Sequence, residues 1–204
     1  MSRLASHRVR AGGRSERVRG QVGAACLALL AEGNVALGPV EVAARAGVSR
    51  ATVHRWWPTK ADLVREALSL HTRSLGVPDT GTWPDDVATL AQRLATFFAD
   101  PVEVSLNELM ASGEHPDYTT TVLQHFQPLF ADWRAVVERA RRRGELIDDV
   151  DADTVLVALV SPLVLMPLLF RRTLTTGEIR RIAELVVSAT TPGQLDAPQT
   201  TTPG

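Results

Sequence analysis

Residues 49 to 60 carry side chains whose types and spacing suit nucleic-acid binding better than catalysis. The segment reads SRATVHRWWPTK. An arginine can donate two hydrogen bonds to a guanine edge, whereas lysine and hydroxyl side chains can bind phosphate oxygens. We expect Arg50 to contact a base, and Thr52 to contact a thymine methyl group or a phosphate. The candidate DNA contacts of this segment are Ser49, Arg50, Thr52, His54, Arg55, Trp56 and Lys60.

Three members of this set are expected to contact the DNA backbone, which fixes the register of a protein on DNA without reading its sequence. They are His54, Trp56 and Lys60. Either tryptophan of the pair could instead pack in a core, and we favour the core for Trp57 and the DNA contact for Trp56. Without the surrounding pattern, an arginine such as Arg50 would more simply be a solvated surface charge.

Sequence patterns typical of enzymes do not occur. There is no nucleophile elbow, phosphate-binding glycine-rich loop or CxxC pair, and the five histidines lack metal-ligand spacing. Glu114, His115 and Asp117 lie close together in the sequence, which alone is weak evidence for a metal site. We therefore expect no enzyme activity, no cofactor and no metal. A small helical enzyme without a recognisable site remains an alternative.

Two short helices joined by a tight turn would position the candidate DNA contacts. Gly38-Pro39 indicates the start of a helix that ends at Ala46, and Gly47 can adopt the positive φ of the turn. Ser49 can cap a second helix, which Pro58 ends. Small or apolar residues fall where the two helices must face inward, namely Val42, Ala43, Val48 and Val53. This spacing predicts a helix-turn-helix.

Helical periodicity recurs along most of the remaining chain and predicts an all-α protein. Helices are expected over 15–32, 59–75, 84–99, 101–112, 116–143, 152–172 and 176–190, with Pro128 leaving open whether 116–143 is one helix or two. The loop at 76–84 suggests a domain boundary. We expect a flexible basic arm over 1–14, a helix-turn-helix domain over 15–75, a larger helical domain over 76–190 and a disordered tail over 191–204.

The two signs of charge are separated along the chain, although its net charge is −1. Residues 1–75 hold twelve Lys or Arg against five Asp or Glu, whereas residues 76–204 hold ten against eighteen. A basic first third favours a polyanionic partner, and Arg8, Arg10, Arg14 and Arg17 could reach a minor groove. Chance clustering is the alternative. The single cysteine, Cys26, fits a core position and a reducing cytoplasm, and no signal peptide is expected.

The region around the predicted helix-turn-helix resembles the tetracycline-repressor (TetR) family of bacterial regulators. The matching residues are Ala43-x-x-x-Gly47-Val48-Ser49, then Thr52 to Trp57, Pro58-x-Lys60 and Leu63, within a resemblance that covers about residues 14–70. Two positions depart from the family pattern, because His54 stands where tyrosine is common and Trp57 where phenylalanine is common.

The resemblance implies an N-terminal three-helix helix-turn-helix domain joined to a larger C-terminal domain for dimerisation and ligand binding. It further implies a cytoplasmic homodimer that binds a near-palindromic operator in double-stranded DNA and represses transcription until a small apolar or amphipathic effector releases it. A helix-turn-helix used only for protein contacts is the alternative. The salt dependence of DNA binding would distinguish the two, since phosphate contacts weaken steeply with ionic strength.

The C-terminal domain contains an unusually apolar segment at 154–170, which has no charged residue. It falls short of the ~20 residues of a membrane helix and contains Pro162 and Pro167, so we expect a dimer and core helix and no membrane contact. Residues 178–189 are expected to complete the dimer interface, with Ile179, Ile182, Leu185 and Val186 on one side.

Apolar residues of the same domain could line an effector pocket, although residues of these types are more often plain core. The candidates are Phe97, Leu109, Met110, Phe126, Phe130 and Trp133. The basic run Arg139, Arg141, Arg142 and Arg143 is expected to be a solvated helix end rather than a second DNA contact.

Overall fold

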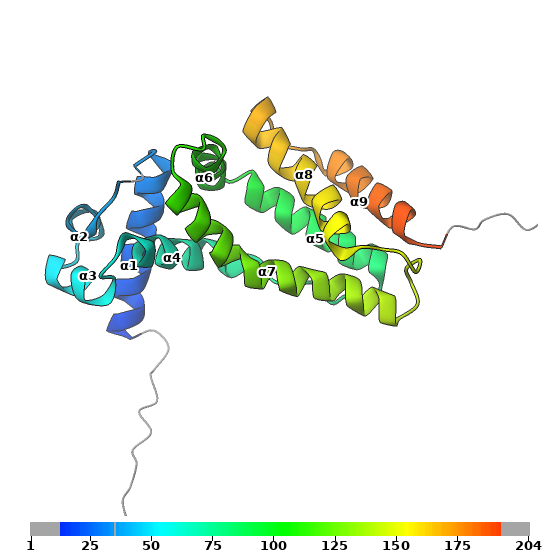
Figure 1. Ribbon diagram of the computed structural model, residues 1–204, viewed down its shortest axis with the longest axis horizontal. Coiled ribbons are helices and arrows are strands. Elements are labelled where there is room, and N and C mark those ends of the chain that lie inside the picture. Colours follow the sequence, from blue (N-terminus) through cyan, green and yellow to red (C-terminus); the bar gives the residue numbers. More distant parts are fainter. Residues whose placement is uncertain (1–12, 35, 193–204) are drawn as a thin grey trace, which may run out of the picture. The chain divides into compact units, whose positions relative to one another are not determined.

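A computed structural model describes residues 13–34 and 36–192, and these residues form helices and loops without a strand (Figure 1). The all-α fold expected from the sequence is confirmed. The α-helices are α1 (Arg14–Ala31), α2 (Pro39–Ala46), α3 (Arg50–Trp56), α4 (Lys60–His71), α5 (Trp83–Phe98), α6 (Pro101–Ala111), α7 (Pro116–Arg142), α8 (Ala152–Phe170) and α9 (Thr176–Thr190). A 3-10 turn, Thr72–Ser74, follows α4.

Helix α7 is continuous through Pro128, which answers the question left open by the sequence. A proline inside a helix lacks the N–H that would bond the carbonyl four residues earlier, here that of Gln124. Gln124 and Pro128 are both exposed, so water can reach that carbonyl. The helix therefore passes a proline without leaving a buried polar group unsatisfied.

The chain divides into two compact units. The head unit comprises the chain up to Ser74 together with Ser105–His125, and the body unit comprises Leu75–Val104 together with the chain from Phe126. The sequence alone suggested one boundary near residue 76. The assignment of residues 105–125 to the head unit depends on tertiary contacts, which helical periodicity does not encode.

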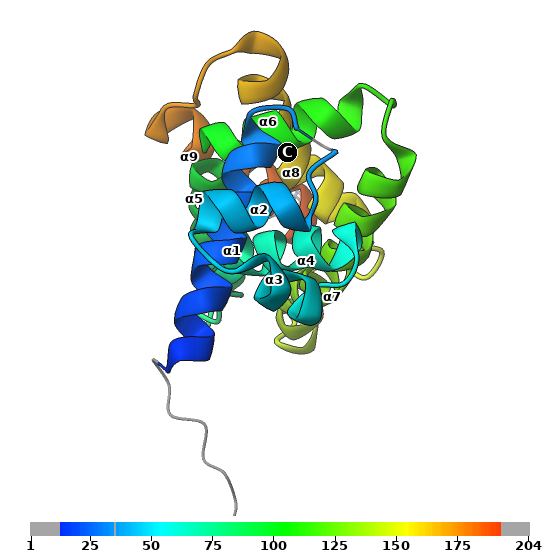
Figure 2. The same ribbon diagram turned by 90° about the vertical axis from the view of Figure 1, so that its left-hand side faces the viewer.

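The core of the head unit lies where α1 packs against α4 and α2 packs against both α1 and α3 (Figure 2). Cys26 and Leu30 of α1 are buried together with Leu63 and Leu68 of α4. Gly23 allows the close approach of α1 to α4, because an added Cβ would lie 3.2 Å from the Leu70 side chain. The core position expected for Cys26 is confirmed, and burial raises the pKa of its thiol to about 12.

The core of the body unit lies between α5, α8 and α9, which run side by side (Figure 1). Trp83 of α5 is buried, and its indole N–H donates a 2.8 Å hydrogen bond to the Thr190 hydroxyl of α9. The Glu145 carboxylate accepts a 2.8 Å bond from the Trp83 backbone N–H. These contacts join the start of α5 to the ends of α7 and α9.

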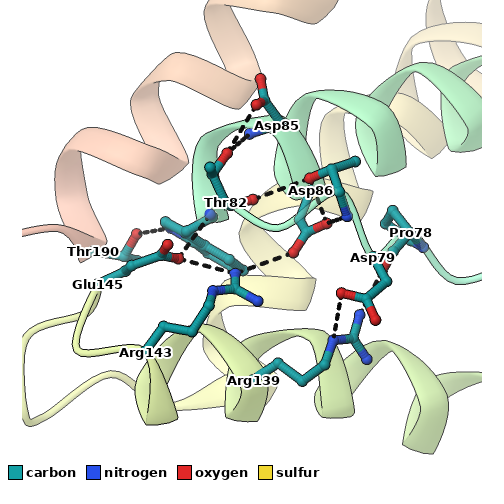
Figure 3. Close-up of polar contacts among 11 residues, drawn as sticks. Pro78, Asp79, Thr82, Asp85, Asp86, Arg139, Arg143, Glu145 and Thr190 are labelled. Carbon is teal, nitrogen blue, oxygen red and sulfur yellow. Dashed lines mark hydrogen bonds and ion pairs between the residues drawn. The ribbon is translucent and has the colours of Figure 1, made fainter.

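Three of the four arginines at the basic end of α7 are not the solvated charges expected from the sequence, whereas Arg142 is exposed as expected and forms no ion pair with another described residue. Figure 3 shows Arg143 between the carboxylates of Asp86 and Glu145, at 3.2 Å and 2.9 Å. Arg139 pairs with Asp79 and donates to the Pro78 carbonyl, while Arg141 pairs with Glu138. The expectation was wrong for Arg139, Arg141 and Arg143 because these arginines meet acidic partners in the folded chain, two of them more than fifty residues away in sequence.

Helix α8 buries one stripe against its own chain, including Val155, Leu159 and Leu163. Its other side is apolar and exposed, with Val157 64% exposed and Phe170 65% exposed. Over the described residues, α8 is the only helix long and apolar enough to cross a membrane, a test that core helices of soluble proteins also pass. The sequence placed Ile179, Ile182, Leu185 and Val186 on one side of α9, but Ile179 and Val186 face the core, whereas Leu185 is 68% exposed.

Candidate nucleic-acid interface

The turn between α2 and α3 has the geometry that the sequence predicted. Gly38 precedes α2 and Pro39 occupies its first turn. Gly47 ends α2 at φ 64°, a left-handed conformation that glycine adopts without steric strain. The Ser49 hydroxyl then accepts a 3.2 Å hydrogen bond from the Thr52 backbone N–H and so caps α3. Local sequence signals therefore fix both ends of the turn.

Two apolar side chains hold α3 against the head unit. Val53 is fully buried and Trp57, directly after the helix, is almost fully buried, as the sequence predicted. The Trp57 indole N–H donates a 3.1 Å hydrogen bond to the Glu66 carboxylate of α4. The side of α3 away from Val53 and Trp57 is exposed, so its polar side chains can reach a partner.

A groove of about 920 Å³ lies between the first half of α1 and the α2–α3 turn with the adjoining face of α3. One wall consists of Arg14, Ser15, Arg17, Val18 and Gln21, and the other of Gly47, Val48, Ser49, Thr52, Arg55 and Trp56. Arginine, amide and hydroxyl groups from both walls face the same space. Such groups are the usual donors to phosphate oxygens and base edges.

The predicted contacts divide between this groove and the far flank of α3. Five of them line the groove, namely Arg14, Ser49, Thr52, Arg55 and Trp56. Arg50 and His54 are exposed outside it and share the other flank, because residues four apart in a helix lie on the same side. Lys60 is exposed at the first position of α4.

Helix α1 forms one wall of the site, which was not predicted from the sequence. Arg14, expected in the arm, is instead the first residue of α1, while residues 1–12 lie outside the described residues. Gln21 was not proposed as a DNA contact, and Arg17 was proposed only as a contact to the minor groove. A signal was present, because residues 14, 17, 18 and 21 follow the helical spacing of a single face.

The basic side chains of the head unit fall into two groups. Arg19, Arg45 and Arg65 form ion pairs with Glu66, Glu32 and Asp62 respectively. These hydrogen bonds raise the pKa of Arg19 and of Arg45 above the ordinary value for arginine. The second group forms no ion pair with another described residue and comprises Arg14, Arg17, Arg50, Arg55, Lys60 and Arg73, of which Arg73, after α4, does not line the groove. The second group therefore keeps its charge available for a polyanion.

The predicted effector-pocket residues do not all belong to one unit. Phe97, Phe126, Phe130 and Trp133 lie in the body unit as a chain of ring contacts, with centroids 6.3, 6.0 and 5.4 Å apart in that order. The Trp133 indole N–H is buried and has no hydrogen-bond partner among the described residues. Leu109 and Met110 are half-buried in the head unit.

Within residues 13–34 and 36–192, no group of three His, Cys, Asp or Glu residues is placed to hold a metal ion. Glu114 and His115 border a pocket of about 350 Å³ in the head unit, together with Glu32 and Glu108. This arrangement gives no support to the metal site that Glu114, His115 and Asp117 weakly suggested in the sequence.

Comparison with known proteins shows that the N-terminal and C-terminal parts of the chain are both similar to bacterial regulators. Residues 24–67 match the family described as bacterial regulatory proteins, tetR family, and residues 77–186 match the tetracyclin repressor-like C-terminal domain. The chain is 31% identical over 156 residues to the uncharacterised HTH-type transcriptional regulator YdeS of Bacillus subtilis, covering 74% of each chain. It is 28% identical over 153 residues to the HTH-type transcriptional regulator AqdR of Rhodococcus erythropolis, again covering 74% of each.

Solved structures show the same fold. The structure of the TetR family transcription regulator SCO0332 superimposes with a TM-score of 0.66 at 24% sequence identity, covering 86% of this chain and all of that one. The fold of both units is therefore shared with these regulators.

Proposed function

The chain belongs to the TetR family of bacterial transcriptional regulators, and on that premise we propose that it represses transcription by binding a near-palindromic operator as a homodimer. The observation that supports this proposal most directly is the groove beside α3, whose arginines form no ion pair with another described residue. The chain is a DNA-binding regulator. The operator contacts, the dimer, the effector and the cytoplasmic location are the parts that we propose.

We assign different roles to the two flanks of α3. Arg50 on the outer flank would read a guanine edge in the major groove, and Thr52 and Arg55 on the inner flank would contact bases or phosphates. Arg14 and Arg17 of α1, which line the groove of the protein, would bind the phosphate backbone of the DNA. These contacts would fix the register of α3 on the DNA. This division explains why Arg14 and Arg17 of α1 and Arg50 and Arg55 of α3 form no ion pair with another described residue, whereas Arg19 of α1 pairs with Glu66.

We propose that the dimer forms through residues 152–190, which include α8 and α9. The exposed apolar side chains Val157, Leu165, Leu169, Phe170 and Leu185 support this surface as an interface. Monomeric proteins rarely expose large contiguous apolar patches. A second copy would cover this face, and the resulting twofold symmetry would match a near-palindrome with one recognition helix in each of two successive major grooves.

We propose that an apolar or amphipathic effector binds beside the aromatic chain of the body unit. The unpartnered Trp133 N–H supports an effector that carries at least one hydrogen-bond acceptor, since burying an unsatisfied donor is unfavourable. Binding would favour a dimer conformation whose two recognition helices no longer fit both half-sites.

Selection of genomic DNA fragments by the purified protein at two salt concentrations tests the proposed function. We expect enrichment of a near-palindromic site and an affinity that falls steeply with salt. Arg50→Ala should weaken binding to that site by about 1–3 kcal/mol. Arg45→Ala removes the same charge outside the groove and should leave the site preference unchanged. Absence of DNA binding at low salt would refute the proposal and favour a protein-binding role for the helix-turn-helix.

A further inference from the structure

The Glu66 side chain joins three parts of the head unit. It extends from α4 and is only 8% exposed. The Arg19 side chain of α1 donates to it through Nε and Nη2, at 3.0 Å to Oε1 and 2.9 Å to Oε2. The Trp57 indole N–H, directly after α3, donates to Oε2 at 3.1 Å. One carboxylate therefore holds α1, α4 and the end of α3 together.

A carboxylate in this environment depends on both partners. Transfer of an ionised group out of water is strongly unfavourable unless it is paired and hydrogen-bonded. The guanidinium of Arg19 supplies the charge and a planar fork of donors, which a lysine cannot reproduce. Trp57 supplies a single neutral donor. The three side chains are thus restricted to one arrangement.

This arrangement bears directly on the recognition helix. Helix α3 has seven residues, too few to be stable alone in water, so its orientation depends on what anchors it. Val53 anchors its middle and Trp57 anchors its end. The hydrogen bond from Trp57 to Glu66 restricts the rotation of the indole ring. Because Trp57 directly follows α3, the bond also restricts the orientation of α3 relative to the core.

The Glu66 carboxylate also binds a residue of α1, the helix that forms the other wall of the groove. Arg19 lies on α1 between the groove residues Arg17 and Gln21, but its guanidinium is bound by Glu66. The ion pair therefore restricts the rotation of α1 relative to α4. Since Glu66 binds one residue next to each wall, it fixes the separation and relative orientation of the walls.

We propose that Glu66 is a positioning residue that sets the geometry between the arginines of α1 and the recognition helix α3, and thereby the preference for the operator over other DNA. The proposal rests on the proposed function. Base readout needs side chains held within about 0.5 Å of their bonding geometry, whereas phosphate attraction tolerates larger displacements. Loss of Glu66 should therefore reduce operator binding more than binding to unrelated sequences.

The test compares Glu66→Gln, Trp57→Phe and Arg19→Lys with the parent protein and with Glu32→Gln as a control. Glu32 also pairs with an arginine of the head unit, but it is exposed and does not line the groove. Affinity is measured for the site selected by the parent and for a duplex of scrambled sequence, at one salt concentration. Circular dichroism establishes that each variant is folded at the assay temperature.

We expect Glu66→Gln and Trp57→Phe to bind the operator at least about tenfold more weakly, equivalent to 1.4 kcal/mol, with unchanged affinity for the scrambled duplex. Arg19→Lys should show a smaller loss, and Glu32→Gln none. If Glu66→Gln does not fold, Trp57→Phe decides the question, because it keeps an aromatic ring in the core and removes the N–H.

Two results overturn the inference. Folded variants with the operator affinity of the parent would show that Glu66 only stabilises the core. Equal losses on both duplexes would show general weakening without positioning. If the parent protein itself selects no site, the proposed function fails before any variant is needed, and the inference fails with it.

Discussion

Replacement of Asp86 by asparagine tests whether the polar network of the body unit stabilises the fold. Asp86 is fully buried. Its Oδ1 accepts hydrogen bonds from the Thr80 backbone N–H at 2.7 Å and the Thr80 hydroxyl at 2.8 Å, and its Oδ2 accepts one from Arg143 at 3.2 Å. The asparagine has nearly the same shape but only one oxygen. Either Thr80 or Arg143 must therefore face an NH₂ group.

The expected loss follows from these contacts. If the amide oxygen keeps both bonds to Thr80, the bond to Arg143 is lost, and a hydrogen bond to a charged group contributes about 1.5–3 kcal/mol. Arg143 retains its 2.9 Å bond to Glu145 and is partly exposed, so its guanidinium is not left as an unpaired buried charge. We expect Asp86→Asn to lower the free energy of unfolding by about 1.5–3 kcal/mol, which corresponds to about 3–12 °C in Tm.

Urea denaturation followed by tryptophan fluorescence measures this change, because Trp83 and Trp133 lie in the body unit. Asp85→Asn is a matched control. Asp85 is exposed and accepts a 2.9 Å bond from the Thr82 hydroxyl, so its replacement should change the free energy of unfolding by less than about 0.5 kcal/mol. Equal effects of the two substitutions would refute the reasoning, since burial and the Arg143 contact distinguish them.

Three further predictions concern other parts of the chain. Burial raises the pKa of the Cys26 thiol to about 12, so Ellman's reagent should label Cys26 at pH 8 only after unfolding; rapid labelling of the folded protein would contradict this. Hydrogen bonds from Arg172 and Thr175 lower the pKa of Glu178 from 4.5 to about 2. The stabilisation of α9 by ionised Glu178 should be complete above about pH 4.5 and be lost as the pH falls through about 2. An NMR titration midpoint of Glu178 near 4.5 would disprove the lowered pKa. Val157→Lys should convert a dimer into a monomer at micromolar concentration in sedimentation experiments, and an unchanged dimer would exclude Val157 from the interface.

The elements of the candidate site were predictable from the sequence where the signal was local. The capping of α3 by Ser49 matches the expectation, and a capping box of Thr59 and Asp62 begins α4 in the same local way, where the Thr59 side-chain hydrogen bond lowers the pKa of Asp62. Helix caps involve residues three apart, so their side chains can be identified without knowledge of the fold. The core position of Trp57 was likewise predictable from its place at the end of the helix.

The partners of charged residues were not predictable. Arg19 meets Glu66 across 47 positions and Arg143 meets Asp86 across 57. Sequence periodicity gives the face of a helix on which a residue lies, but not which side chain of another helix it faces. For this reason Arg139 and Arg143 were expected in solvent, and Arg17 and Gln21 were not recognised as one wall of the groove.

The sequence by itself determined the all-α class, the helix-turn-helix and its resemblance to the TetR family, because helix ends, turns and apolar stripes depend on neighbouring residues. Only the tertiary structure decided which arginines are paired and which remain available to DNA, and which apolar side chains of α8 and α9 stay exposed. Those properties depend on how helices distant in sequence pack together, and packing brings Glu66 to Arg19 and Trp57, whereas it brings no carboxylate within residues 13–34 and 36–192 into an ion pair with Arg50 or Arg55.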